Sequence, residues 1–174
     1  MMEHPTPLPG LTIIDEPTPS PVGPHCLFDA NPFEQGEAQM QVWREPKPRT
    51  LRGMRVQMAP KAQAHLVRPI AGTVWVMVLD LRRSSPTFSH WYGVELRGDE
   101  PKSLWIPEAC AHGFLTLGEN NLLLSLASVK DEPILQRGIR WDDPQFGMAW
   151  PYAPEVISEL DSALPDTPLD SYSV

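Results

Sequence analysis

The stretch HLVRPIAGTVWVMVLDL, residues 65–81, decides the class of fold. Its two halves, residues 65–70 and 73–81, are rich in β-branched and other apolar side chains, which favour strands. Ala71-Gly72 lies between them and is typical of a turn. The stretch therefore predicts two strands joined by a short connection.

Short strand patterns continue on both sides of this stretch. Residues 51–58 alternate apolar and polar side chains over most of their length, as a half-buried strand does. Further runs follow at residues 91–96, 103–106, 113–117 and 122–129. Because helical periods are missing between them, the pattern predicts an all-β antiparallel sandwich or barrel. One short helix is expected over residues 154–161, where a proline and an acid open the run and Pro165 follows it.

Proline is unusually frequent, with 21 residues in the chain. Each proline ring removes a backbone donor and fixes φ, so the Pro-rich residues 1–24 are predicted to form an extended N-terminal arm. The apolar run Leu11–Ile14 could add an edge strand there, either within the chain or across a subunit boundary. Residues 25–174 are predicted to form one domain, because a chain of 174 residues suffices for a single sizeable core.

The charge composition disfavours several classes of partner. Fourteen Lys and Arg residues against 22 Asp and Glu residues give a net charge of −8, a sign that repels phosphate backbones and anionic lipids. No apolar run approaches the roughly 20 residues of a membrane span, and the N-terminus lacks a signal-peptide pattern. We therefore expect a soluble, cytoplasmic protein that binds neither nucleic acid nor membrane. The two cysteines, Cys26 and Cys110, are predicted to be free thiols.

Motifs for several common chemistries are missing from the sequence. There is no Gly-x-Ser-x-Gly elbow, Walker-type phosphate loop or dinucleotide glycine fingerprint, which argues against a hydrolase and against a nucleotide cofactor. The five histidines never occur as His-x-His or His-x-x-x-His, and a metal site in a barrel needs several convergent ligands. We therefore expect neither a metal nor another cofactor.

Four sequence blocks carry a family resemblance: DLRRSSPTF at residues 80–88, WIPE at 105–108, AHGF at 111–114 and RGIRWDDP at 137–144. In this order and spacing, they resemble the dTDP-4-dehydrorhamnose 3,5-epimerase family, and the resemblance runs from about Leu51 to Leu169. It implies a cupin-type double-stranded β-helix, or jelly roll, that forms a homodimer with strand exchange near the N-terminus. Family members need no metal and act on a 4-keto-6-deoxyhexose linked to a nucleoside diphosphate.

The resemblance also implies which positions carry the chemistry. A 4-keto group acidifies the neighbouring C–H bonds, so epimerisation needs a base, a group that stabilises the enolate, and an acid on the opposite face. In the family these roles belong to a His, a Lys and a Tyr, and an Asp orients the His. Matched by motif, the four positions are occupied here by Arg55, His65, Ser125 and Asp161 respectively.

All three chemical positions are therefore substituted. Arg55 is a poor base because a guanidinium stays protonated, and Ser125 lacks the acidity of a phenol. We therefore predict altered or reduced epimerase chemistry, in which His65 is the acid/base, Arg55 stabilises negative charge and Asp161 supports them. The predicted substrate-binding residues are Arg52, His112, Ser125 and Gln57.

These assignments leave alternatives open. Arg55 and Asp161 could form a structural ion pair, since buried charges need partners, while His65 and His112 could simply pack in the core. The segment that helps hold the sugar in the family is replaced here by Met-Gln-Val-Trp at residues 40–43. An epimerase-like isomerase is favoured. The alternatives are a catalytically inactive homologue that serves as a binding or partner subunit, and a barrel that acts on a non-sugar substrate.

Overall fold

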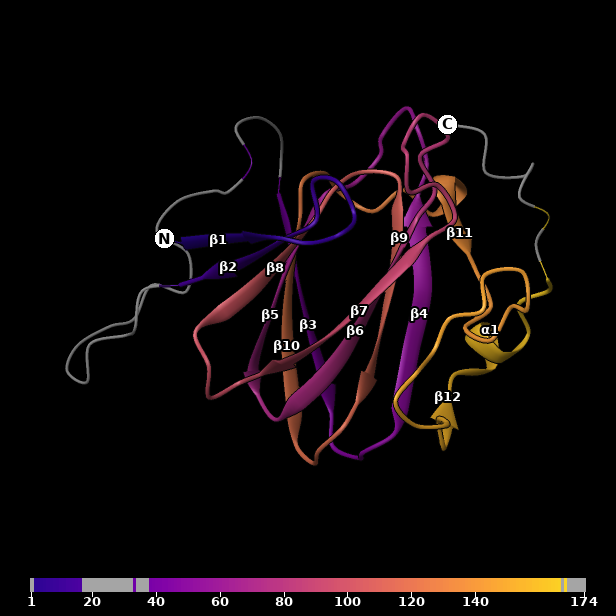
Figure 1. Ribbon diagram of the computed structural model, residues 1–174. Helices are drawn as coiled ribbons and strands as arrows, with labels where there is room; N and C mark the ends of the chain where they lie inside the picture. Colours follow the sequence, from indigo (N-terminus) through magenta and orange to yellow (C-terminus); the bar gives the residue numbers. More distant parts are fainter. Residues whose placement is uncertain (1, 17–32, 34–37, 167, 169–174) are drawn as a thin grey trace.

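Two antiparallel sheets that face each other form the molecule (Figure 1), in a computed structural model that describes residues 2–16, 33, 38–166 and 168. The first sheet has the order β1 (Met2–Pro5), β2 (Thr12–Asp15), β8 (Lys102–Ile106), β5 (His65–Ala71), β10 (Asn121–Ala127), β3 (Gln39–Glu45). The second has the order β11 (Gln136–Gly138), β4 (Thr50–Gln57), β9 (Cys110–Thr116), β6 (Thr73–Asp80), β7 (Trp91–Arg97). The all-β prediction is therefore confirmed.

The two strands predicted from residues 65–81 are β5 and β6, and they lie in different sheets. The chain crosses from one sheet to the other at Gly72, which has a φ of +76°. A side chain there would meet Asn121, whose amide oxygen accepts a hydrogen bond from the Thr73 backbone at 3.0 Å. Glycine is therefore needed at this crossing, both for its backbone conformation and for the close approach of Asn121.

The N-terminal residues belong to the first sheet. β1 and β2 form a hairpin, and β2 pairs with β8 of the same chain, so the run Leu11–Ile14 does contribute to a strand. Leu8 and Leu11 are buried in the core between the sheets. The boundary proposed at residue 24 stays a prediction, because residues 17–32 lie outside the described part of the chain.

The helix predicted over residues 154–161 is wrong in extent. Only α1 (Glu159–Ser162) is helical, after β12 (Val156–Ile157), which pairs with β4 in parallel; a 3-10 turn, η1 (Pro133–Leu135), precedes β11. Ser158 caps α1 by accepting a hydrogen bond from the Asp161 backbone. Residues 156–157 therefore pair with β4 and are not helical, and the helix begins only after its N-cap, Ser158. No helix in the described residues is long and apolar enough to cross a membrane.

A cavity of about 510 Å³ opens between the sheets. Strands β3, β5 and β10 line it from one side, and β4 and β9 from the other. Its apolar wall is continuous with the core, because Val67, Val76, Phe114 and Leu123 belong to both. The rest of the lining is polar, which makes this cavity the candidate site.

Candidate functional site

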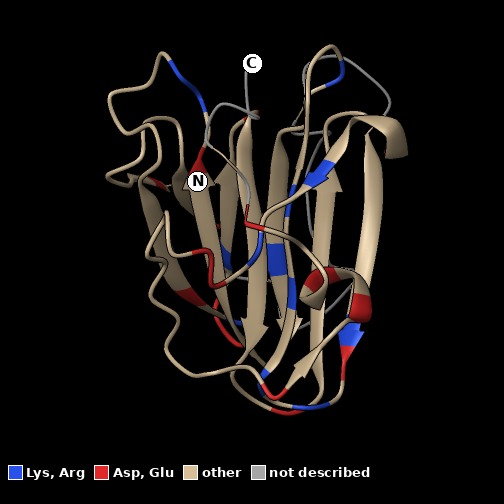
Figure 2. Cartoon of the chain, turned by 90° about the vertical axis from the view of Figure 1, so that its right-hand side faces the viewer, with Lys and Arg blue, Asp and Glu red and all other residues tan. Residues whose placement is uncertain are grey.

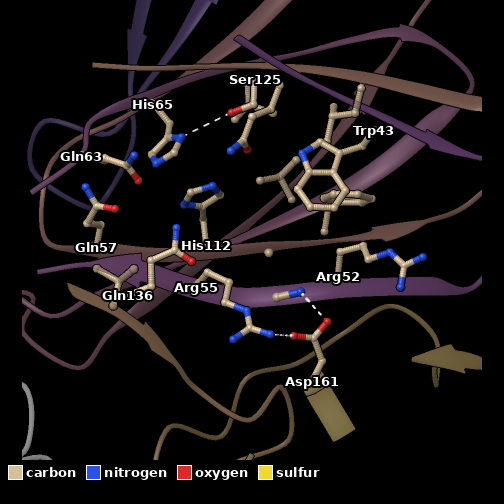
Figure 3. A pocket seen from close by; sticks show the side chains of 18 of the residues that line it. Trp43, Arg52, Arg55, Gln57, Gln63, His65, His112, Ser125, Gln136 and Asp161 are labelled. Carbon is tan, nitrogen blue, oxygen red and sulfur yellow. Dashed lines mark hydrogen bonds and ion pairs between the residues drawn. The ribbon is translucent and has the colours of Figure 1, made fainter. Parts of the chain in front are cut away.

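All seven residues predicted for the site line this one cavity, although they come from separate parts of the chain: Arg52, Arg55, Gln57, His65, His112, Ser125 and Asp161. Figure 3 shows how they are distributed around it. β4 supplies the arginines and Gln57, while β5, β9 and β10 supply His65, His112 and Ser125. The structure thus places the predicted residues together, and their roles stay predictions.

Two histidines form the centre of the cavity lining. Nδ1 of His65 lies 3.3 Å from Oγ of Ser125 (Figure 3), and the His65 and His112 ring centroids are 4.3 Å apart. Burial lowers the pKa of His65 well below its usual value, and repulsion by a charged His112 lowers it further. Burial also lowers the pKa of His112 to about 4. Both imidazoles are therefore neutral at pH 7, and each can offer one donor and one acceptor.

Arg55 and Asp161 form the ion pair that the sequence suggested. Nη2 of Arg55 lies 2.5 Å from Oδ1 of Asp161, whose side chain is only 5% exposed. Oδ2 of Asp161 accepts hydrogen bonds from Ser158 Oγ and from the Gly53 backbone. In Figure 2 the acidic residues of α1 lie beside basic residues of the neighbouring strands. The ion pair therefore joins α1 to β4 through Oδ1, while Oδ2 is held by Ser158 and the Gly53 backbone.

Gly53 makes this arrangement possible. Its φ is +95°, and a Cβ there would lie 2.8 Å from the His112 carbonyl oxygen. The pairing of β4 with β9 is irregular at this point, between Arg52 and Arg55. A glycine thus allows β4 to approach β9 closely and to direct a backbone N–H at Asp161.

The β3 wall contains Glu45, which sequence reasoning missed, and Trp43, which lies in the replaced segment 40–43. Glu45 accepts a hydrogen bond from Nε of Arg52 at 2.5 Å, and it is buried. Trp43 lines the cavity and packs edge-on against Phe114, with ring centroids 6.1 Å apart. No motif marked Glu45, because its partner lies on another strand. Arg52 is thus an ion-paired cation at the cavity, beside an aromatic wall.

Four glutamines hold the segment 129–132 beside the cavity, and we call this set, Gln39, Gln41, Gln57 and Gln63, the glutamine clasp. Gln57 donates to the carbonyl oxygens of Lys61 and Lys130 and accepts from the backbone of Glu132. Gln63 donates to the carbonyl oxygen of Val129. The amide of Gln57 is therefore engaged with backbone groups, and substrate binding by Gln57 stays a prediction.

No three His, Cys, Asp or Glu side chains among the described residues are placed to hold a metal ion. Cys110 is a free, buried thiol, and burial raises its pKa to about 12. It is therefore not a reactive nucleophile. Cys26 lies outside the described residues.

Comparison with known proteins identifies the family to which this fold belongs. The sequence model of the dTDP-4-dehydrorhamnose 3,5-epimerase family matches residues 26–168. The chain therefore belongs to this family, and the predicted resemblance is confirmed.

Individual relatives agree with this assignment. The dTDP-4-dehydrorhamnose 3,5-epimerase of Salmonella typhimurium is 40% identical over 121 residues, which are 68% of this chain and 66% of that protein. This chain thus spans just under two thirds of that relative's length.

Solved structures share the fold. An epimerase of Mycobacterium tuberculosis has a TM-score of 0.82 at 26% identity, over 98% of this chain and 90% of that one. A 3′-monoepimerase from Streptomyces bikiniensis in complex with dTDP-quinovose has a TM-score of 0.81 at 26% identity, over 93% and 86% of the two chains. The cupin-type jelly roll is therefore confirmed.

Proposed function

We propose that this protein binds a nucleotide-linked 4-keto-6-deoxy sugar, or a similar enolisable carbonyl compound, and moves a proton at a carbon next to the carbonyl group. The observation that carries this proposal is the neutral His65, which faces the same cavity as two arginines. Family membership and the dTDP-quinovose bound to the Streptomyces bikiniensis relative support a dTDP-linked ligand. The chemistry is altered or reduced relative to a 3,5-epimerase, because a base and an acid position are substituted.

The cavity suggests a division of roles. His65 is the acid/base, and its contact with Ser125 fixes the orientation of the ring. Arg52 and Arg55 place positive charge where an enolate develops negative charge. His112 and Asp161 support these groups by packing and by the ion pair. A one-sided isomerisation or a single epimerisation fits this set better than a double inversion.

Proton exchange tests this function directly. With dTDP-4-keto-6-deoxyglucose in D₂O, we expect the purified protein to remove the proton NMR signal at C3 or C5 faster than a buffer blank. His65→Gln is expected to slow this exchange by about 100-fold or more, in the range of general acid–base catalysis. His90→Gln, which removes an exposed imidazole outside the cavity, is the matched control. Full exchange by His65→Gln would exclude His65 from the mechanism.

A binding protein without catalysis is the second candidate. It is favoured by the lowered pKa of His65, since such an imidazole is a weak base, and by the serine at the acid position. Thermal stabilisation by dTDP without any proton exchange would support it. If dTDP does not stabilise the protein and no proton exchange occurs, a non-sugar substrate would be favoured.

We also propose a homodimer, as the family resemblance implies, and a cytoplasmic location. Light scattering of the full chain is expected to give twice the monomer mass of 19.5 kDa. A mass of one chain across a range of protein concentrations would contradict the dimer.

A further inference from the structure

Three described residues bring a carboxylate to the cavity, and they differ in their partners: Glu45, Asp131 and Asp161. Glu45 is paired with Arg52, and Asp161 with Arg55. Asp131 makes no ion pair with any described residue; its side-chain partners are amides. Asp131 is thus the cavity carboxylate whose negative charge is not balanced by a cation in the described part of the chain.

The glutamine clasp holds Asp131 firmly in place. Gln41 Nε2 donates to Oδ2 at 2.6 Å, and Gln63 Nε2 donates to Oδ1 at 3.0 Å. The backbone N–H of Asp131 donates to Gln39 Oε1 at 2.7 Å. Each carboxylate oxygen keeps a further lone pair beside its amide donor. The carboxylate is therefore oriented in advance and still able to accept a proton.

Asp131 and His65 belong to the same end of the cavity. Ser125 contacts His65 and is the register partner of Gln41 across β10 and β3. Gln41 in turn binds Asp131. Gln63, the other amide on Asp131, lies next to His65 in Figure 3. A carbonyl compound in contact with His65 would therefore also lie near Asp131.

Proton uptake by His65 and by Asp131 would change the number of charges in the cavity in opposite ways. Proton uptake by His65 would create a buried positive charge close to His112, which the interior disfavours. Proton uptake by Asp131 instead removes a charge from the cavity. A neutral histidine is suited to a different task, because its ring N–H can donate to a carbonyl oxygen.

We propose that Asp131, rather than His65, is the general base of this cavity and that His65 donates a hydrogen bond to the carbonyl oxygen. This assignment rests on the proposed function and revises only the role of His65 within it. The proton of the C–H bond next to the carbonyl moves to an Asp131 oxygen. The electron pair of that bond forms the C=C bond, and the carbonyl becomes an enolate whose oxygen accepts a hydrogen bond from His65. Return of a proton from Asp131 restores the ketone on the same face.

This mechanism predicts exchange with retention of configuration. The proton on Asp131 exchanges with solvent D₂O before Asp131 returns it, so deuterium enters from the face on which the proton left. Ser125 stands at the family's acid position and is a weak proton donor. Deuterium incorporation from D₂O is therefore expected to outpace inversion at the same carbon.

Two variants of neighbouring residues test the role of Asp131. Asp131→Asn is expected to slow the exchange of dTDP-4-keto-6-deoxyglucose in D₂O by about 100-fold or more, while dTDP binding measured by calorimetry stays within about two-fold. Glu132→Gln is the matched control, because Glu132 pairs with Lys61 and does not line the cavity. Its exchange rate is expected to equal that of the unaltered protein.

Chemical rescue separates a base from a structural role. In a folded Asp131→Gly variant, added formate is expected to restore part of the exchange, since a free carboxylate can replace the missing one. Undiminished exchange by Asp131→Asn, or a folded Asp131→Gly variant that formate does not restore, overturns the assignment but leaves the proposed function intact. An unaltered protein that binds dTDP without exchange overturns both.

Discussion

Replacement of Asp80 by alanine is expected to lower the free energy of unfolding by about 3 kcal/mol or more, the cost of breaking a buried charge network. The Asp80 side chain is fully buried at the end of β6. Its two oxygens accept hydrogen bonds from the side chains of Arg82, Ser85 and Thr87. The loop that follows β6 is therefore built around this carboxylate.

The charged state of Asp80 shows how strong this network is. Burial alone would raise its pKa, but hydrogen bonds from Arg82, Ser85 and Thr87 outweigh that effect and lower the pKa to about 2. The carboxylate is therefore ionised throughout the neutral range. Its removal would leave the Arg82 guanidinium and two hydroxyl groups without their shared acceptor.

Urea unfolding at neutral pH measures this loss. Asp99→Ala is the matched control, since Asp99 also binds an arginine, Arg97, but is 67% exposed. Exposed ion pairs contribute little, so the control is expected to change stability far less than Asp80→Ala does. Equal losses in the two variants would show that the Asp80 network does not stabilise the fold.

Acidification from pH 8 to pH 5 is expected to lower stability by about 2 kcal/mol through His112 alone, and His65 adds to this loss. The pKa of His112 is about 4 in the folded protein against 6.5 for an ordinary histidine. The unfolded chain therefore binds more protons between these values. Stability is complete above pH 6.5 and falls as the pH drops toward 4. Because the pKa of Asp80 is about 2, its contribution to the pH dependence of stability falls at lower pH than that of His112.

Unfolding in urea at several pH values measures the slope of the free energy of unfolding against pH. His112→Gln is expected to reduce the dependence on pH between 5 and 8, because a glutamine does not titrate. His90→Gln should retain it, since His90 is exposed to water before and after unfolding. A slope that survives in a folded His112→Gln, His65→Gln double variant would exclude the histidine pair as its cause.

The strand pattern could be predicted where strands pack against the core. β5 and β6 are rich in buried apolar side chains, and their pattern identified them directly. β3 was missed because polar and apolar side chains alternate only over residues 39–42, before Trp-Arg-Glu at residues 43–45 interrupts the pattern. Met40 and Val42 are exposed, while Gln41 lines the cavity. A strand beside a polar cavity therefore does not follow the rule that apolar side chains point inward.

Site residues could be predicted only where they lie at positions matched by a sequence motif. The pairing of Arg55 with Asp161 was suggested by matched positions, and the structure shows the contact. The glutamine clasp has no such signal. Gln39 and Gln41 contact Asp131, although they are 92 and 90 residues away from it in the sequence. Hydrogen bonds between residues so distant in the chain depend on the completed fold.

The glutamine clasp also has a consequence for how this protein can be redesigned. Within the glutamine clasp, a single residue such as Gln57 makes hydrogen bonds to several backbone groups. Most amino-acid substitutions there would therefore disturb the segment 129–132. Trp43 and Leu123, on the apolar wall, line the cavity through packing contacts. Laboratory evolution toward a new ligand should therefore randomise Trp43 and Leu123 and keep the four glutamines fixed.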